Sequence, residues 1–445
     1  MAGEIASPVP TERESETTQG NYFVSNYPPF SFWKPEHTHE VSQALGTSPS
    51  PDIPLGIYLH IPFCRKRCHF CYFKVYTDMR ESEIQHYLDA VLAELRLYSQ
   101  KPFIAGRKPD FVYFGGGTPS YLSSRQLSRL TDEMKTLLPW DQAREVTFEC
   151  EPGTLTEAKL KVIKDLGVTR LSLGIENFDE GILKTNGRAH GAREIDRAYA
   201  FARSLGFPQV NIDLIAGMVG ETTENWQDCV RRTIALEPDS VTIYQMEIPY
   251  NTTISKEMRA HGETIAPVAS WQTKRDWVAY AFARFEEAGY TVTSAYTAVK
   301  NSTLSRFVYR DQLWHGADLL GLGVASFSYL AGIHFQNEHE FNSYLGRLQK
   351  GELPIYRALR PTEEERLIRE FILQMKLGHV EPSYFQKKFG VDIRQRFAIP
   401  LSSLQDQKVL LQTPQGIELN RAGLLQVDRL LAGFFLPQHR NVRYT

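Results

Sequence analysis

Six short runs of apolar residues along residues 56–247 constrain the fold of this chain more than any other feature. Each run is rich in valine, isoleucine, leucine, phenylalanine or tyrosine and is bounded by glycine, proline or polar residues, which is typical of buried β-strands. The runs are GIYLHI (56–61), FVYFGGG (111–117), EVTFEC (145–150), RLSLGIE (170–176), VNIDLIAG (210–217) and SVTIYQME (240–247). We therefore expect six strands in this part of the chain.

Stretches with helical spacing separate these runs. Five apolar residues of 81–100 fall on one helical face, namely Ile84, Leu88, Val91, Leu92 and Leu95. Similar patterns occur at 123–138 and 156–167, and the segments 191–205 and 222–236 complete the series. The alternation predicts an α/β fold whose parallel sheet has right-handed crossovers, either an open doubly wound sheet or a full or partial barrel.

The residues that could carry chemistry follow these strands directly. In parallel α/β folds the catalytic groups lie at the carboxyl ends of the strands. The groups at the six predicted ends are a cysteine cluster, residues 115–119, Glu149 with Glu151, Glu176, Asp213, and residues 244–247. We expect all six to meet at one mouth of the sheet.

The pattern divides the chain into four predicted parts. Residues 1–50, rich in serine, threonine, proline and glutamate at the start, are expected to be a flexible N-terminal segment, of which the aromatic stretch 22–34 packs onto the main body. The alternating domain is expected over 51–250, and an α+β extension that begins with an amphipathic helix at 270–290 over 251–355. Residues 356–445 are expected to form a mostly helical, winged-helix-like cap with a hairpin at 409–420.

Charge and hydropathy exclude two classes of partner. The 445 residues carry 50 basic and 52 acidic side chains and a net charge of -2, which argues against binding to nucleic acid by bulk charge. No run of 18 apolar residues is present, and the first residues lack an apolar signal core, so we expect a cytoplasmic protein with no membrane association. Near-neutral charge favours a small-molecule substrate.

Three of the five cysteines lie within eight residues. Cys64, Cys68 and Cys71 have the spacing C-x3-C-x2-C, which suits an iron–sulfur cluster or zinc better than a disulfide framework. Zinc would need a fourth ligand, for which His60 or His69 is available. The location at a strand end and the three basic residues 65–67 favour the iron–sulfur interpretation. Cys150 and Cys229 are interpreted as buried apolar-type thiols, with a smaller expectation that Cys150 faces the site.

The segment HIPFCRKRCHFCYF resembles the signature of radical S-adenosylmethionine enzymes. Six further segments narrow the resemblance to the oxygen-independent coproporphyrinogen III oxidase-like family, because they occur in the order and approximate spacing of that family. They are FGGGTPSYL, FECEPGTLT, RLSLGIENF, NGRAHG, NIDLIAG and LWHGADLLGLGVASFSY. The similarity runs from about 55 to 345, with a weaker match from about 360 to 440. It implies a partial (β/α)6 barrel with an α+β extension and a small C-terminal domain.

The resemblance also implies cofactors and their ligands. Cys64, Cys68 and Cys71 would bind a [4Fe-4S] cluster, whose open iron chelates one S-adenosylmethionine. Residues that would contact this first molecule are Tyr58, Gly115, Gly116, Gly117 and Glu149. Residues that match positions around a second S-adenosylmethionine are Phe70, Gly117, Thr118, Glu176, Arg188 and Asp213, with Gln245 and Phe327 aligned less securely. The expected partners are an electron donor such as flavodoxin or ferredoxin and, for one branch of the family, a methyltransferase-like protein.

Departures from the family pattern bear on the reaction. The oxidase is expected to carry a fourth cysteine where this chain has Phe73, a Gln-Ser pair in place of Glu176-Asn177, and a proline in place of Val219. Because the segment CYFKVYTD is similar to relatives that act on aromatic natural products, the leading prediction is methyl or methylene transfer to an sp2 carbon, giving C-methylation or cyclopropanation. The alternatives are porphyrin or haem processing, a haem chaperone, and a zinc-stabilised α/β protein.

Overall fold

The computed structural model describes residues 23–261, 267–440 and 442. Its centre is a parallel sheet, in which each of six strands pairs with the next along the chain. The strands are β1 (Leu55–Ile61), β2 (Pro109–Gly116), β3 (Glu145–Cys150), β4 (Arg170–Glu176), β5 (Gln209–Ala216) and β6 (Ser240–Gln245). The six predicted strands and their order are confirmed.

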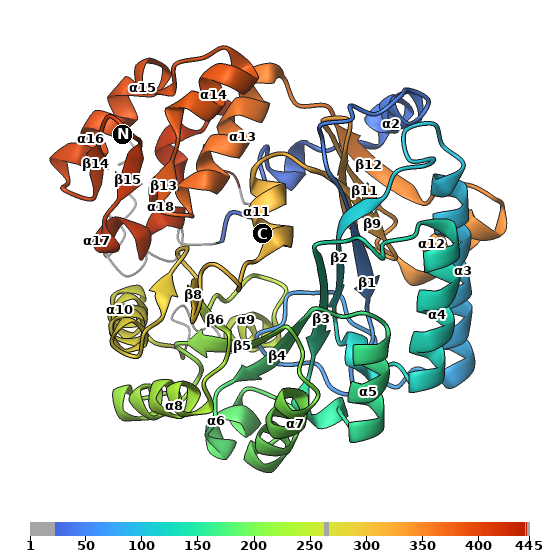
Figure 1. The fold of residues 1–445 in the computed structure, drawn as a ribbon, viewed down its shortest axis with the longest axis horizontal. Coiled ribbons are helices and arrows are strands. Elements are labelled where there is room, and N and C mark those ends of the chain that lie inside the picture. The colour runs from blue at the N-terminus through green and yellow to red at the C-terminus, as the bar shows by residue number, and fades with distance from the viewer. Residues whose placement is uncertain (1–22, 262–266, 441, 443–445) are drawn as a thin grey trace, which may run out of the picture.

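Strands from the extension continue the same sheet at both edges, and the order is β12-β11-β10-β9-β1-β2-β3-β4-β5-β6-β8-β7. Beside β1 lie β9 (Asp318–Leu322), which is parallel to it, and β10 (Phe327–Leu330), β11 (Ile333–Asn337) and β12 (Ile355–Leu359). Beside β6 lie β8 (Thr297–Val299) and β7 (Thr291–Val292), both in antiparallel pairings. The sheet curves into a partial barrel (Figure 1).

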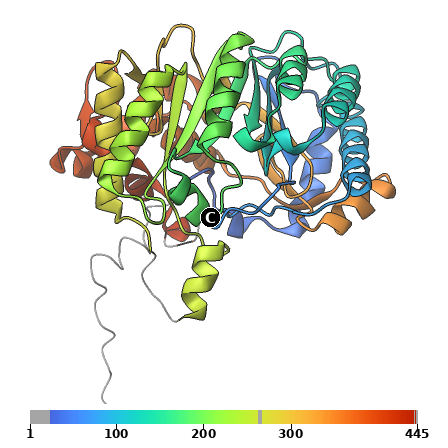
Figure 2. The ribbon, with the colours of Figure 1, turned by 90° about the horizontal axis from the view of Figure 1, so that it is seen from below.

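Helices cover the outer, convex side of the sheet (Figure 1). Those that follow β1–β6 are α3 (Glu81–Ser99), α4 (Ser124–Leu137), α5 (Glu157–Asp165), α6 (Glu180–Thr185), α7 (Ala192–Ser204), α8 (Thr223–Leu236) and α9 (Thr253–Ala260). The extension adds α10 (Trp271–Glu287), α11 (Val308–Trp314) and α12 (Phe341–Gln349). Helix α9 stands away from the rest of the molecule (Figure 2).

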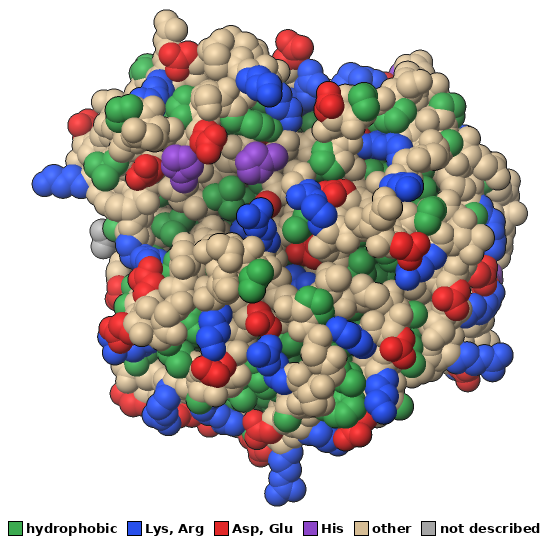
Figure 3. Space-filling view, in the orientation of Figure 1, with side chains coloured by type: hydrophobic (Ala, Val, Ile, Leu, Met, Phe, Trp, Pro, Cys, Tyr) green, Lys and Arg blue, Asp and Glu red, His purple; other side chains and the backbone are tan. Residues whose placement is uncertain are grey.

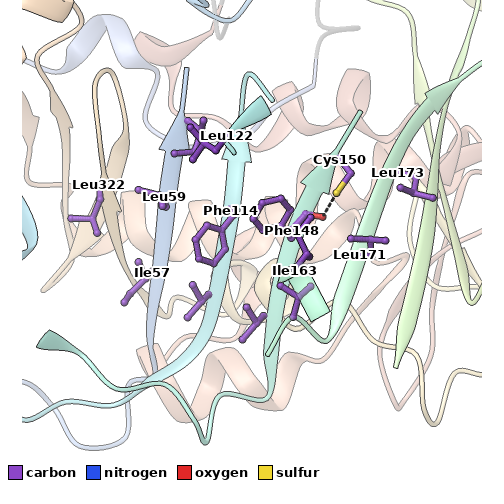
Figure 4. Close-up of a cluster of buried hydrophobic side chains, with 14 of the residues drawn as sticks. Ile57, Leu59, Phe114, Leu122, Phe148, Cys150, Ile163, Leu171, Leu173 and Leu322 are labelled. Carbon is purple, nitrogen blue, oxygen red and sulfur yellow. Dashed lines mark hydrogen bonds between the residues drawn. The ribbon is translucent and has the colours of Figure 1, made fainter. Parts of the chain in front are cut away.

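The two faces of each barrel strand differ in chemistry. Side chains that point outward are apolar and pack under the helices in one continuous core, as Figure 4 shows for Ile57, Phe114, Phe148 and Leu171. Alternate residues point inward, and many of these are polar. The strands therefore alternate between apolar and polar residues, although the sheet is parallel, because the interior of the barrel is kept polar.

A second hydrophobic core forms the C-terminal part of the molecule. Its elements are α13 (Glu363–Met375), α14 (Pro382–Phe389), α15 (Ile393–Arg396), α16 (Ala398–Asp406), α17 (Arg421–Leu424) and α18 (Val427–Leu431), with the small sheet β13 (His379–Val380), β15 (Ile417–Leu419) and β14 (Leu410–Gln412). The hairpin predicted at 409–420 corresponds to β14 and β15. Strand β12 extends to Leu359, so the large sheet continues past the boundary predicted at 355/356.

The N-terminal segment differs from the prediction of a flexible stretch over 1–50. Residues 1–22 lie outside the described residues, but α2 (Thr38–Leu45) is a regular helix. It forms because Val41, Ala44 and Leu45 are buried in the main core. The aromatic stretch before it packs on the body as expected, and Trp33 is buried.

On the face drawn in Figure 3, acidic and basic side chains are interspersed and hydrophobic side chains occur in small groups. This face shows no large apolar patch of the kind that marks an interface. Over residues 23–261, 267–440 and 442, no helix is both long and apolar enough to cross a membrane.

Candidate active site

The inner face of the barrel is closed at the bottom and open at the carboxyl rim. Along β6, Ser240 and Thr242 point inward and are 0% and 3% exposed, whereas Tyr244 at the rim is 43% exposed. Below the rim, Asn211 Oδ1 accepts hydrogen bonds from the hydroxyls of Ser240 at 2.8 Å and Thr242 at 3.1 Å. The six strand ends thus surround an opening, as expected of a parallel α/β fold.

The cysteine loop follows β1 at this rim. Cys64 is buried, whereas Cys68 and Cys71 are half-buried, and all three are free thiols. A short parallel bridge fixes the loop, since the Cys64 amide donates to the Tyr76 carbonyl at 3.1 Å. The Cys71 amide donates to the Cys68 carbonyl at 3.1 Å. The three thiols are therefore held on one compact turn.

The environment of the thiols fits an iron–sulfur cluster. Burial raises the pKa of Cys64 to about 11 and that of Cys71 to about 12, so these thiols ionise only when a metal or another cation compensates their charge. Among the described residues, no three His, Cys, Asp or Glu side chains are close enough to hold a single metal ion. A cubane would bind each cysteine through a different iron, so three cysteines on one loop can serve it without meeting at a single metal ion.

The histidines considered as a fourth zinc ligand are engaged elsewhere. His69 Nδ1 lies 3.0 Å from the Thr185 carbonyl, and its ring fills the space beside Gly187. His60 Nδ1 lies 3.1 Å from the Tyr58 hydroxyl, and burial lowers the pKa of His60 to about 4. Neither histidine is presented to the thiols as a ligand in this arrangement.

The glycines after β2 bring bare backbone against the cysteine loop. A Cβ at Gly117 would lie 3.0 Å from Cys64 Sγ and from the carbonyls of Ile61 and Phe63. Gly116 has φ +114°, a conformation that glycine adopts without strain. The backbone of Gly117 therefore lies against the Cys64 sulfur, whereas a Cβ at Gly116 would meet the His60 ring at 2.6 Å.

Three carboxyl groups lie at the same rim. Glu149 accepts from the Tyr113 hydroxyl at 2.6 Å and from the Gly116 amide at 3.2 Å. Burial, together with the charge of Asp213, raises the pKa of Glu149 and of Glu176 to about 7. Carboxylates that repel one another favour a bound cation, so the rim suits the sulfonium and ammonium groups of S-adenosylmethionine.

Arg188 joins the carboxyl groups to the cysteine loop. Its Nη1 donates to Cys68 Sγ at 3.4 Å, and its Nη2 donates to the Gly174 carbonyl at 2.6 Å and lies 3.5 Å from Glu176 Oε1. Glu176 has φ +66° in a non-glycine residue, at an irregularity in the pairing of β4 with β5. Such backbone strain is concentrated at functional sites.

The other residues predicted for the cofactors divide into two groups. Thr118 donates its hydroxyl to Cys64 Sγ at 3.4 Å, and Phe70 packs in a small apolar cluster with Ile215. Gln245 points outward and donates to the Leu425 carbonyl at 3.2 Å, while Phe327 packs 4.5 Å from the Phe30 ring. Thr118 and Phe70 therefore lie at the cysteine loop. Gln245 contacts the C-terminal domain, and Phe327 contacts the N-terminal segment.

Cys150 lies away from the site, although it follows Glu149 directly. Strand alternation turns it outward into the core beneath the helices (Figure 4). Cys229 is buried on α8. Both fit the interpretation as apolar-type thiols.

Sequence reasoning missed the residues that line the barrel below the rim. Arg170 is buried and stacks over the Phe307 ring at 4.1 Å, and Tyr113 packs on Tyr309 at 4.4 Å. Phe307 is the N-cap of α11 and Tyr309 lies in its first turn, and no local pattern indicates that this helix start contacts the barrel. The inward direction of Arg170 and Tyr113 could have been predicted, because each lies an even number of positions before a rim residue on its own strand.

Comparisons with known proteins agree with this geometry. Residues 58–233 match the model of the Radical SAM superfamily. An oxygen-independent coproporphyrinogen III oxidase of Helicobacter pylori is 27% identical over 399 residues, which cover 86% of this chain and 86% of that protein. The haem chaperone HemW of Bacillus subtilis is 24% identical and matches over 85% of this chain and 98% of its own length.

One solved structure has the same fold over almost the whole chain. The coproporphyrinogen III oxidase HemN from Escherichia coli superimposes with a TM-score of 0.80 at 24% identity and covers 93% of this chain and 96% of its own. These relatives support the predicted porphyrin alternative; they give no support to the methyltransferase and cyclopropanation branch, which was the leading prediction.

The cofactors follow from the superfamily and from the fit of the rim. The cofactors of this superfamily, and of this chain, are a [4Fe-4S] cluster and S-adenosylmethionine. Three thiols, glycine backbone and clustered carboxyl groups lie at one rim, and with these matches the chain is similar to radical SAM proteins, among them coproporphyrinogen III oxidases and HemW.

Proposed function

We propose that this chain is a radical SAM enzyme that acts on a tetrapyrrole. The observation that carries the proposal is the convergence of the three thiols with the bare backbone of Gly116 and Gly117 and with the rim carboxyl groups. The substrate class is taken from the names of the relatives, which are coproporphyrinogen III oxidases and a haem chaperone. The methyl-transfer prediction has no comparable support.

Each rim residue has a physical task in this proposal. When bound and reduced, the cluster would supply the electron that cleaves the 5′-carbon–sulfur bond of S-adenosylmethionine into methionine and a 5′-deoxyadenosyl radical, which abstracts hydrogen from a substrate. Cys64, Cys68 and Cys71 would hold three irons and leave the fourth open. Glu149 would accept hydrogen bonds from ammonium or hydroxyl groups, and Arg188 would offer its guanidinium to a carboxylate.

Anaerobic reconstitution tests the cofactor part of the proposal. The wild-type chain should take up about four irons per molecule and release 5′-deoxyadenosine when dithionite and S-adenosylmethionine are added. Cys68→Ala should lose both, whereas Cys150→Ala, a matched cysteine turned into the core, should keep both. A wild-type chain that takes up one zinc ion and no iron would contradict the proposal.

The substrate part needs its own assay. Coproporphyrinogen III or haem should be consumed together with formation of 5′-deoxyadenosine. The proposal places the enzyme in the cytoplasm, with a flavodoxin or ferredoxin as the physiological reductant. Cofactor cleavage that neither tetrapyrrole stimulates, with both compounds recovered unchanged, would contradict a tetrapyrrole substrate.

A haem chaperone is the second candidate, because the match covers almost all of HemW. Stoichiometric haem binding without cleavage of S-adenosylmethionine would favour it over the enzyme.

Methyl or methylene transfer is the third candidate and depends on a second S-adenosylmethionine near Glu176, Arg188 and Asp213. It predicts S-adenosylhomocysteine alongside 5′-deoxyadenosine, and deuterium from a labelled methyl group in both 5′-deoxyadenosine and the product. The observation that favours methyl or methylene transfer is Phe73, which lies where the oxidase pattern has cysteine. A methyltransferase-like partner belongs to this candidate alone.

A further inference from the structure

Three large aromatic side chains at the mouth of the barrel have no task in the chemistry above. Tyr72, Phe73 and Tyr244 are 44%, 41% and 43% exposed. Large exposed aromatic side chains that gather in one place mark binding surfaces more often than they mark ordinary protein surface. These three side chains at the cysteine loop are therefore candidates for a binding surface.

Tyr244 points into the opening of the barrel. It shares strand parity with Ser240 and Thr242, which are buried deeper along β6. The barrel is therefore filled at the level of Thr242 and open at the level of Tyr244. Any molecule that enters from the rim reaches the Tyr244 ring before it reaches the polar floor at Asn211.

The neighbours of Tyr244 in the sheet place it at the rim. It pairs in register with Ile215 of β5, and Asp213 pairs with Thr242 two residues earlier. Burial and the charges of Asp213 and Glu149 also raise the pKa of Tyr244 well above the usual tyrosine value. The ring is therefore accessible at a position beside the rim carboxyl groups.

Tyr72 and Phe73 bring a second aromatic pair to the same place. Both follow Cys71 directly, and their rings lie 4.5 Å apart with an angle of 31° between them. Their backbone is anchored, because Asn251 Nδ2 donates to the Tyr72 carbonyl at 2.6 Å and Arg67 Nη2 donates to the Cys71 carbonyl at 3.1 Å. Phe70 of the same loop packs in one apolar cluster with Ile215, the register partner of Tyr244, so the loop lies beside the end of β6.

We propose that Tyr72, Phe73 and Tyr244 form an aromatic surface that stacks on a pyrrole ring of the substrate beside the cluster-binding loop. The proposal deepens the proposed function and rests on it. Offset stacking on aromatic side chains suits a flat π-system. The neighbouring groups Asp213 and Glu149 are acceptors when ionised, so the ring should carry N–H donors, as a pyrrole does.

Titration of the anaerobically reconstituted chain with coproporphyrin III, followed by quenching of its fluorescence, tests the proposal. Tyr244→Ala and Phe73→Ala should each weaken binding by about tenfold, the effect expected of one lost stacking partner. Tyr244→Phe should bind within about twofold of the wild type, because it keeps the ring. Leu411→Ala is the matched control, since Leu411 is an equally prominent apolar side chain on the C-terminal hairpin.

Two outcomes would overturn the proposal. If Tyr244→Ala and Phe73→Ala bind the porphyrin as the wild type does, the aromatic surface is not its site. If the wild type does not bind it, the ring class is wrong. Iron content of each variant separates loss of ring binding from loss of the cluster. Failure of the proposed function would instead appear as a wild type that releases no 5′-deoxyadenosine, whether or not the porphyrin binds.

Discussion

Single residues set the site partly by what they lack. Gly117 places its backbone against the sulfur of Cys64 and two strand-end carbonyls, at distances that leave no room for a methyl group. The rim carboxyl groups contribute through their presence. Because they are buried and close to one another, part of them stays protonated and uncharged until a cation binds.

Gly117→Ala should lower the iron content after reconstitution and weaken binding of S-adenosylmethionine by about tenfold or more, because Cys64 and the loop carbonyls would have to move. Iron analysis and equilibrium dialysis measure the two effects. Gly346→Ala is the control, since a Cβ there would have no neighbour within 4 Å among the described residues. Equal iron content in both variants would contradict this reading of Gly117.

Glu149 should make cofactor binding depend on pH. Burial raises its pKa to about 7, with Asp213 adding repulsion while the Tyr113 hydroxyl, the Gly116 amide and Arg170 favour the carboxylate. The protonated acid present below this pKa attracts an ammonium group weakly, so affinity for S-adenosylmethionine should rise as pH increases through about 7. Glu149→Gln should flatten that rise. A wild-type profile without a change between pH 6 and 8 would show that Glu149 does not control binding.

At the scale of elements, the alternation of side chains along the strands separates the core from the chemistry. Outward residues join helices to the sheet, and inward residues make the polar floor and the rim. Some helices are also tied to the sheet by buried polar groups. Glu94 of α3 accepts from the Gly323 amide at 2.9 Å, from Asn337 Nδ2 at 2.6 Å and from the Tyr344 hydroxyl at 2.6 Å.

Glu94→Ala should therefore destabilise the fold by about 3–5 kcal/mol, because it leaves the Gly323 amide and the Tyr344 hydroxyl without an acceptor in the interior. Urea denaturation of the chain measures the change. Asp89→Ala on the same helix loses an exposed pair with Arg129 and should cost about 0.5 kcal/mol. Similar losses for the two variants would show that the buried network contributes little.

At the scale of the whole molecule, a buried cation joins the C-terminal core to the N-terminal segment. Lys376, at the end of α13, has a fully buried side chain that lies 2.8 Å from Asp428 and donates to the Val24 carbonyl at 2.6 Å. Its ammonium also lies 3.6 Å from the centre of the Phe23 ring. Three distant parts of the chain thus meet at one charge.

Lys376→Ala should destabilise the C-terminal part by about 3 kcal/mol or more, since Asp428 would lose its cation in a mostly buried setting. Hydrogen exchange should show the loss of protection in α13 and α18 first. Lys387→Ala, an exposed lysine of α14, should leave exchange unchanged. Unchanged exchange in Lys376→Ala would contradict the role of this contact.

The sequence predicted the order of strands and helices well because each element carries its own periodicity. The strand β3 and the helix α3 follow from spacing alone, and Cys64, Cys68 and Cys71 follow from a local pattern. The sequence did not predict α2, because its burial depends on a partner surface far along the chain. It also did not indicate that Gln245 would contact Leu425, since the direction of a side chain at a strand end depends on the register.

The sequence by itself therefore determined the parallel α/β architecture and the place of the cysteine loop, since both depend on local periodicity and spacing. Only the tertiary structure decided that Arg188 would bridge Cys68 and Glu176, that Cys150 would face the core, and that the cysteine loop would pack beside the end of β6. These relations join residues more than 100 positions apart in some cases, and the curvature and register of the sheet fix them. Long-range packing of this kind leaves no local signal in a chain.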